Sequence, residues 1–233
     1  TQNGADIVIG GTAGDTITTG TDASGDTSRD IVLGDNGNAT FDSQGRIDTI
    51  ESTDTDIGGE DHITTGGGPD IVLAGTDKDT VLTESGNDIV VGDSGQATFN
   101  SDKDANMAAE NIGNLRTINT ITPAVGDNDA ITTDEGSDIV IGGANSDTIN
   151  TYLADEDQWD YVLGDNGTIT FEVDGSIQSI TTSDPDVGAA DTIHTQNGAD
   201  IVIGGTAGDT ITTGTDASGD TSRDIVLGDN GNA

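Results

Sequence analysis

The chain has 233 residues, with 44 Asp and Glu against six Lys and Arg, 35 Gly and no Cys, and its formal net charge is −38. The lack of Cys excludes disulfide scaffolds and Cys-ligated zinc or iron–sulfur sites, and so negative a charge repels a nucleic-acid backbone. No apolar run approaches the ~20 residues of a membrane span. The acid is mainly Asp, 37 residues against seven Glu, which together with Gly is typical of tight turns and of ligands for hard cations.

The chain opens with a segment that it later repeats. Residues 1–39 recur letter for letter as 195–233, a period of 194 residues. Within this period the phrase Asp-Ile-Val marks three related units, since it begins at Asp6, Asp70, Asp138 and Asp200. The repeat predicts units at 1–60, 61–128 and 129–190, followed by the start of the next block at 191–233. We expect the array to continue in both directions in a longer parent protein.

A shorter period of nine residues runs inside each unit. Asp61, Asp70, Asp79 and Asp88 are nine residues apart, and Ile or Val follows each of them two residues later. Six turn residues followed by a three-residue strand are too short for an ordinary sheet but suit a solenoid, in which one inward aliphatic residue per strand builds a continuous core. The sequence therefore predicts an all-β protein, a parallel β-roll or β-solenoid made of units of about 65 residues.

Each unit also contains a segment that predicts a β-hairpin inserted into the roll. An Asp-Gly turn separates 168–171 from 176–180, which favours a hairpin there. Apolar residues lie three apart in the return strands, as in Ile177 and Ile180, so we expect either a bulge or a turn onto the next coil there. The related pairs of segments are 39–41 with 46–50, and 97–99 with 115–118 across a polar loop, 100–114, in which we expect one helical turn.

The nine-residue phrase resembles the calcium-binding nonapeptide of the repeats-in-toxin (hemolysin-type) family, Gly-Gly-x-Gly-x-Asp-x-aliphatic-x. Residues 204–212 keep both leading glycines, the Asp and the aliphatic residue, but have Ala207 in place of the third Gly. The resemblance covers a little over half of the chain. It implies that Ca²⁺ is bound by the nonapeptide aspartates, with turn carbonyls completing the shell.

The spacing of these aspartates supports the same expectation. Turns on one edge of a roll are about 4.8 Å apart, and stacked carboxylates repel one another unless a cation neutralises them. The alternative is that each Asp only caps its turn through backbone amides. Sites shared by neighbouring turns are expected at the pairs 61/79, 70/88, 129/147 and 191/209, with 138/160 and 200/224 as interrupted pairs. The candidate calcium ligands are Asp6, Asp15, Asp30, Asp61, Asp70, Asp79, Asp88, Asp129, Asp138, Asp147, Asp160, Asp191, Asp200, Asp209 and Asp224.

A second group of aspartates lies in the phrase Gly-Asp-Asn/Ser-Gly before each hairpin segment. Its members are Asp35, Asp93, Asp165 and Asp229. Turn chemistry explains them as well as a second class of metal site does.

The sequence favours a structural function over catalysis. His62 and His194 occupy different places in their units, and neither a nucleophile motif nor a phosphate-binding loop is present, so we expect no enzyme. Strands of the type Thr-x-Thr alternate along the chain with Ile-Val-Ile strands, and we expect no long flat threonine array. The expected function is a secreted, calcium-stabilised module of the cell surface (an adhesin stalk, surface-layer or matrix filament) whose partners are calcium and copies of itself, with no nucleic acid and no membrane span. The alternative is a calcium-triggered folding and secretion appendage of a toxin or hydrolase whose catalytic domain lies elsewhere.

Overall fold

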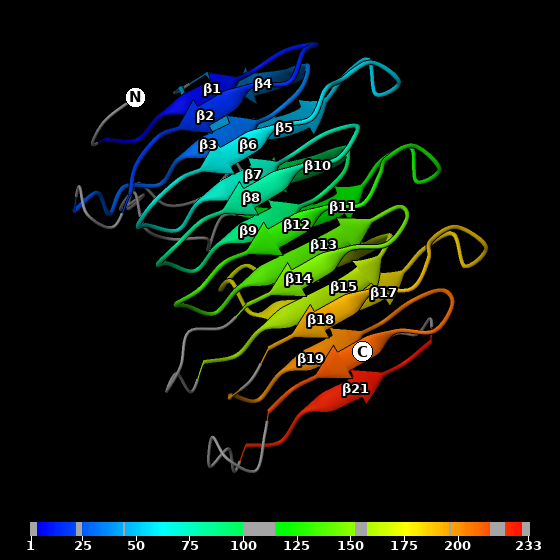
Figure 1. The fold of residues 1–233 in the computed structure, drawn as a ribbon. Helices are drawn as coiled ribbons and strands as arrows, with labels where there is room; N and C mark the ends of the chain where they lie inside the picture. Colours follow the sequence, from blue (N-terminus) through cyan, green and yellow to red (C-terminus); the bar gives the residue numbers. More distant parts are fainter. Residues whose placement is uncertain are drawn as a thin grey trace.

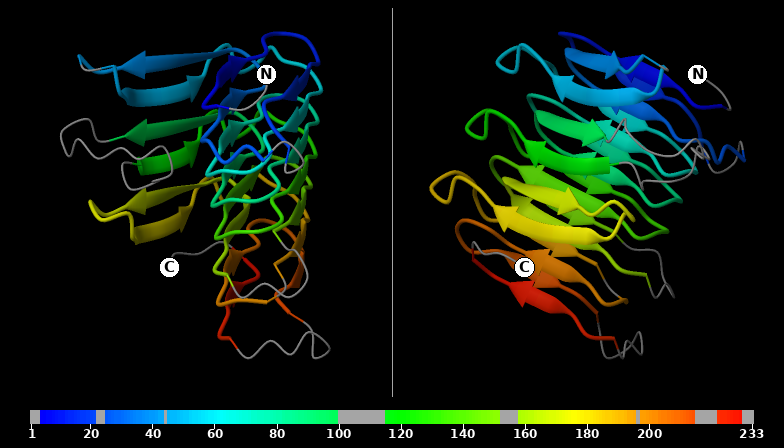
Figure 2. Two further views of the ribbon diagram at one scale, coloured as in Figure 1. Left: turned by 90° about the vertical axis from the view of Figure 1, so that its left-hand side faces the viewer. Right: turned by 180° about the vertical axis from the view of Figure 1, so that it is seen from behind.

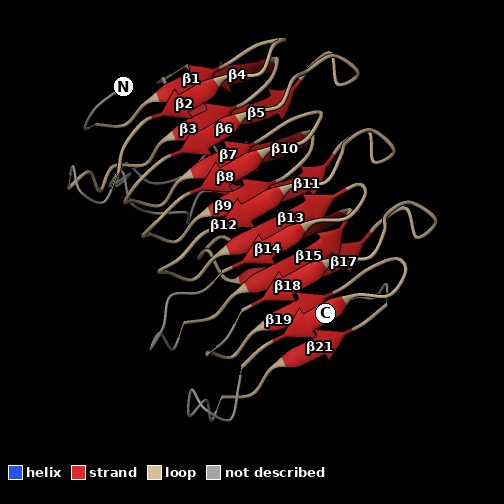
Figure 3. Cartoon of the chain, in the orientation of Figure 1, coloured by secondary structure: helices blue, strands red, loops and turns tan. Residues whose placement is uncertain are grey.

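The computed structural model describes residues 4–21, 25–43, 45–99, 115–151, 158–195, 197–214 and 222–229. Within these ranges the regular structure consists of strands (Figure 3), and no helix is long and apolar enough to cross a membrane. The helical turn expected in 100–114 lies outside the described residues. The short strands stack along one axis in the order of the sequence, as in Figure 1.

Two parallel sheets form the solenoid. We call the first the aliphatic sheet because its strands read Ile-Val-Leu or similar. Its eight strands, in spatial order, are β1 (Ile7–Ile9), β3 (Ile31–Leu33), β7 (Ile71–Leu73), β9 (Ile89–Val91), β13 (Ile139–Gly143), β15 (Tyr161–Asp165), β19 (Ile201–Ile203) and β21 (Ile225–Leu227).

We call the second parallel sheet the threonine sheet. Its seven strands are β2 (Thr16–Thr18), β6 (His62–Thr64), β8 (Thr80–Leu82), β12 (Ala130–Thr132), β14 (Thr148–Asn150), β18 (Thr192–His194) and β20 (Thr210–Thr212). The chain passes from one sheet to the other and back in each coil, so strands that alternate along the sequence segregate in space. The expectation of no threonine array was therefore wrong: nine of the 14 outward positions of this sheet are Thr.

The hairpins form a third, antiparallel sheet on one side of the coils, as Figure 2 shows. This hairpin sheet has six strands, β17 (Ile177–Thr182), β16 (Gly167–Phe171), β11 (Leu115–Thr120), β10 (Gly95–Phe99), β5 (Ile47–Ser52) and β4 (Gly37–Phe41). The pairing of β16 with β17 shifts register between Thr170 and Phe171, which confirms the expected bulge. The extra residue lets Ile177 pair with Phe171 while Ile180 pairs with Ile169.

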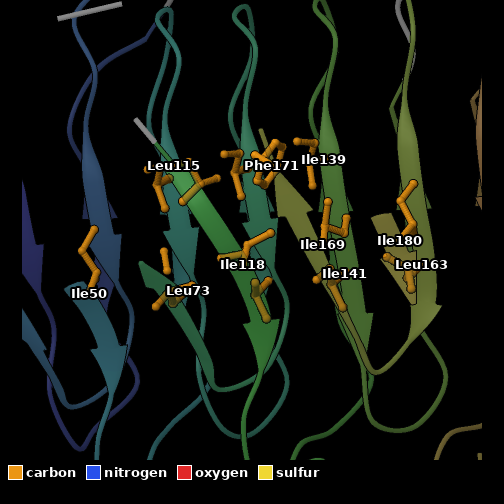
Figure 4. Close-up of a cluster of buried hydrophobic side chains, with 14 of the residues drawn as sticks. Ile50, Leu73, Leu115, Ile118, Ile139, Ile141, Leu163, Ile169, Phe171 and Ile180 are labelled. Carbon is orange, nitrogen blue, oxygen red and sulfur yellow. The ribbon is translucent and has the colours of Figure 1, made fainter. Parts of the chain in front are cut away.

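The aliphatic sheet is the central layer and has a core on each face. The middle residue of each of its strands, such as Val72 or Val140, points into the solenoid and packs against middle residues of the threonine sheet, such as Ile63 and Ile131. The first and third residues point the other way. There Leu73 and its equivalents pack beneath the hairpin strands, as in Figure 4. This explains why the first three positions of each aliphatic strand are apolar or aromatic, whereas most outer positions of the threonine strands are polar. The all-β solenoid with hairpin insertions is thus confirmed.

Candidate metal centre

The turns keep the backbone of the nonapeptide even where its glycines are replaced. In the turns 65–70, 74–79, 83–88, 133–138 and 204–209, the second and fourth residues have positive φ. In 74–79 these are Gly75 (φ 123°) and Asp77 (φ 71°), and in 204–209 they are Gly205 (φ 112°) and Ala207 (φ 75°). Positive φ is easy for Gly and uncommon for other residues. The departures from the nonapeptide pattern therefore change side chains but not the course of the turn.

The two edges of the solenoid differ in the first residue of the turn. Turns from the aliphatic to the threonine sheet begin with Gly, or with Ala at Ala74, and form what we call the glycine edge. Turns in the opposite direction begin with Thr and form the threonine edge, where the described members are Thr19, Thr65, Thr83, Thr133, Thr151, Thr195 and Thr213.

On each edge the nonapeptide aspartates form a hydrogen-bonded ladder. The backbone N–H of each Asp donates to Oδ1 of the Asp in the next coil, for example Asp61 to Asp79 at 2.7 Å and Asp70 to Asp88 at 2.8 Å. The threonine-edge ladder consists of Asp6, Asp30, Asp70, Asp88, Asp138, Asp160, Asp200 and Asp224. The glycine-edge ladder consists of Asp15, Asp61, Asp79, Asp129, Asp147, Asp191 and Asp209.

The structure therefore brings together all fifteen aspartates singled out from the sequence. The expected neighbours 61/79, 70/88, 129/147, 191/209, 138/160 and 200/224 are in direct contact. The ladders also continue across the hairpin insertions, where the sequence spacing gives no period. Asp79 meets Asp129 and Asp88 meets Asp138, although each pair is 50 residues apart.

Each ladder carboxylate uses only Oδ1 in the ladder bond, and many of the Oδ2 atoms have no partner. Asp70 and Asp79 have no exposed surface. A buried carboxylate oxygen without a hydrogen bond or counter-charge is costly. The buried, unpartnered Oδ2 atoms belong to Asp30, Asp61, Asp70, Asp79, Asp129, Asp138, Asp147, Asp191 and Asp209.

The pKa values of the ladder aspartates also indicate that no positive charge balances their buried carboxylates. Burial raises the pKa of Asp79 and Asp147 to about 10, and the nearby carboxylate of Asp129 adds to both shifts. Burial likewise raises the pKa of Asp129 and Asp191 to about 8, against the opposing effect of the ladder hydrogen bond. These directions mean that the ladders of the metal-free protein must either bind protons or acquire positive charge.

On the glycine edge, a carbonyl oxygen of the next coil and the Oδ2 of a ladder Asp both lie close to most of the glycines that begin a turn. A Cβ placed on Gly34 would lie 2.2 Å from Asp61 Oδ2 and 2.2 Å from the carbonyl oxygen of Ala74 in the next coil. The same convergence recurs at Gly164, with Asp191 Oδ2 at 2.2 Å and the Gly204 carbonyl at 2.3 Å. That point lies one carbon–carbon bond from the glycine Cα, so the distances show that each glycine packs directly against a carboxylate oxygen and a carbonyl oxygen and that a larger residue would not fit there. The donor set of carboxylate and carbonyl oxygens fits Ca²⁺.

The aspartates before the hairpins have a different environment. Asp35 accepts from Gly59 N–H through Oδ1 at 3.0 Å and from Thr76 N–H through Oδ2 at 2.6 Å. Asp165 accepts in the same way from Ala189 and Thr206. Each carboxylate thus ties the chain returning from a hairpin to the turn of the next coil. We call Asp35, Asp93 and Asp165 the clamp aspartates. Asp35 and Asp165 accept backbone N–H groups through both carboxylate oxygens, whereas Asp93 accepts from Ala144 N–H through Oδ2 and its buried Oδ1 has no partner.

Two partners of the ladder were missed from the sequence. The hydroxyl of Thr151 donates to Asp160 Oδ2 at 2.5 Å, and that of Thr195 donates to Asp200 Oδ2 at 2.5 Å. The sequence carried this information, because Thr follows each strand of the threonine sheet, whereas Gly or Ala follows each three-residue aliphatic run such as 71–73 or 161–163.

Among the described residues, no three acidic or histidine side chains gather into a group that could hold a metal ion. A calcium shell here would therefore rely on backbone carbonyls in addition to carboxylates. No family model matches the chain, and neither a curated protein nor a solved structure matches it.

Proposed function

We propose that the chain is a calcium-stabilised structural repeat of an extracellular protein, such as an adhesin stalk, a surface-layer component or a matrix filament. The observation that carries the proposal is the run of buried carboxylate oxygens that have no partner along both edges of the solenoid. Bound Ca²⁺ would supply the positive charge that the protein itself lacks, since it has six Lys and Arg against 44 Asp and Glu.

The architecture supports a spacing or scaffolding role. The coils stack along one axis, so each added coil lengthens the molecule by ~4.8 Å without changing its cross-section. The same three layers recur in each coil pair, because every second coil carries a hairpin that covers the aliphatic sheet. A rod of this kind can hold the parts of a larger protein at a fixed separation. The millimolar calcium concentration outside cells matches the affinity typical of extracellular calcium modules, ~10⁻⁴–10⁻³ M.

The test is calcium-dependent folding of the full chain. Far-UV circular dichroism at pH 7.5 should show a coil after metal removal and β-structure with millimolar Ca²⁺. Small-angle scattering should show an expanded chain becoming a compact rod in parallel. Mg²⁺ at the same concentration is the control, since it demands a tighter octahedral shell and should fold the chain poorly. A metal-free chain that is already a folded rod at this pH would refute the proposal.

A further inference from the structure

The outer face of the threonine sheet carries no charged side chain in its described strands. We call this surface the threonine face; it consists of the first and third residues of each strand of that sheet. Of these 14 residues nine are Thr, and the others are His62, Leu82, Ala130, Asn150 and His194. The chain as a whole has 21% charged residues, which would place about three of them on such a face.

The other sides of the molecule all carry acid. Glu51 lies in a strand of the hairpin sheet, Asp77 is exposed in a turn of the glycine edge, and Glu135 is exposed in a turn of the threonine edge. Because the net charge of the chain is −38, two copies that approach each other by any of these sides repel. The threonine face is therefore the side on which two copies meet with the least electrostatic cost.

This face is also uncovered and regular. The hairpin sheet lies on the opposite side of the coils (Figure 2), and none of the 14 residues of the threonine face is buried. The strands are parallel and in register, so that Thr80 pairs with Ala130 and Ala130 pairs with Thr148. The outward side chains thus form two columns that advance by ~4.8 Å at each strand.

From these features we infer that the threonine face is a lateral interface, on which a second copy of this solenoid packs sheet against sheet. A second copy has columns with the same step, so rows of small side chains can match along the whole length of the two faces, as in the dry contact between identical sheets. The methyl group of Thr supplies apolar contact, and its hydroxyl can both donate and accept across the interface. The same surface serves both partners, as in a two-fold dimer.

The inference rests on the proposed function in one respect, because calcium bound along the edges lowers the repulsion between two copies. The size of the face sets the strength of the contact. Seven strands at ~4.8 Å and three residues at ~3.3 Å give a surface of about 300 Å² on each copy. A stable interface of standard size needs about 800 Å² on each partner. One chain of this length should therefore pair weakly, and pairing should strengthen with every coil that is added.

The experiment measures self-association of the full chain by sedimentation equilibrium in millimolar Ca²⁺ at pH 7.5. Thr80→Glu with Thr148→Glu places two charges on the threonine face. Thr40→Glu with Thr98→Glu is the matched control on the hairpin sheet. Each pair occupies one row with a single strand between its members, which contributes Ala130 in the first case and Thr49 in the second.

The average mass of the unmodified chain should rise with concentration from 23.4 kDa toward twice that value. The variant of the threonine face should have a dissociation constant at least tenfold higher, and the control should remain within about twofold of the unmodified chain. Equal weakening in the two variants would overturn the inference, since it would show only general repulsion. An unmodified chain that stays monomeric up to its solubility limit would also overturn it, whether or not the face then binds another occupant such as a neutral polysaccharide.

Circular dichroism of the same samples separates this inference from the proposed function. A chain that folds with calcium but stays monomeric contradicts the inference alone, and a chain that pairs but is folded without calcium contradicts the proposed function alone. Cross-linking keeps the test decisive if the Glu variants do not fold. The chain has no Cys, so the single variants Thr80→Cys and Thr98→Cys each offer one thiol to a short bis-maleimide. Dimers should form through Thr80→Cys at least tenfold more than through Thr98→Cys, and equal yields would overturn the inference.

Discussion

Acid should fold the calcium-free chain, the opposite of the usual response of a protein to low pH. Burial raises the pKa of Asp129 from 3.8 to about 8. The native state therefore binds a proton at pH 7 that the unfolded chain has released, and stability falls as pH rises through this range. Below 3.8 both states are protonated and the contribution is fully present; it is lost as pH rises toward the folded pKa of about 8.

The change in folding free energy with pH is large enough to be measured. At 1.36 kcal/mol per pH unit, one such carboxyl adds about 3 kcal/mol of stability between pH 7 and pH 5. The pKa of Asp70, Asp79, Asp93, Asp147 and Asp191 is also raised to about 7 or above, with burial as the main cause. Protonation of these groups therefore shifts stability in the same direction as that of Asp129, and a change of a few kcal/mol is a large part of the folding free energy of an ordinary domain, about 5–15 kcal/mol.

The assay is circular dichroism of the metal-stripped chain between pH 8 and pH 4, with residual calcium checked by elemental analysis. We expect β-structure to appear as pH falls. Asp129→Asn removes a buried titrating group and should move this transition to higher pH. Asp174→Asn removes the same charge from an exposed hairpin turn, where hydrogen bonds from Ser176 lower the pKa of Asp174. If both variants shift the transition equally, general charge repulsion explains it and the reasoning from burial is refuted.

Three further predictions concern the calcium-loaded protein and can be checked by thermal or denaturant unfolding. Asp35→Asn should lower the free energy of unfolding by about 1–3 kcal/mol, because both carboxylate oxygens accept backbone N–H groups and the amide would place a donor against one of them. Its control is Asp42→Asn, which changes a hydrogen bond within the turn of one hairpin and should leave the contact of that hairpin with the next coil unchanged. Gly142→Ala should prevent normal stacking, since its Cβ would meet the Gly164 carbonyl oxygen at 2.1 Å, whereas Gly208→Ala has nothing within 4 Å and should be close to neutral. Ile118→Ala should cost about 2–5 kcal/mol by leaving a cavity beneath the hairpin sheet, and Phe41→Ala, at a side chain that is 51% exposed, should cost clearly less.

The sequence by itself determined the repeating part of this protein. A nine-residue period with Asp at one position and an aliphatic residue two places later predicts short strands, tight turns and a solenoid. The same Asp-x-aliphatic pattern selects all fifteen ladder aspartates, including Asp30, Asp160 and Asp224, which lie outside the uninterrupted nine-residue period. The three-residue spacing of Ile177 and Ile180 predicted either a bulge or a turn onto the next coil, and the strand pairing shows the bulge.

Only the tertiary structure showed which aspartates become neighbours across the hairpin insertions and which strands share a sheet. No local pattern joins Asp79 to Asp129, since a hairpin of its own register separates them along the chain. Nor does the sequence order show that Thr-x-Thr and Ile-Val-Ile strands, which alternate along the chain, collect on separate sheets. The strands segregate because successive strands lie on opposite sides of each coil. As a result, the turns on one edge of the solenoid begin with Thr and those on the other edge begin mostly with Gly. The chemistry available to each aspartate is set by the edge on which it lies, which only stacking creates.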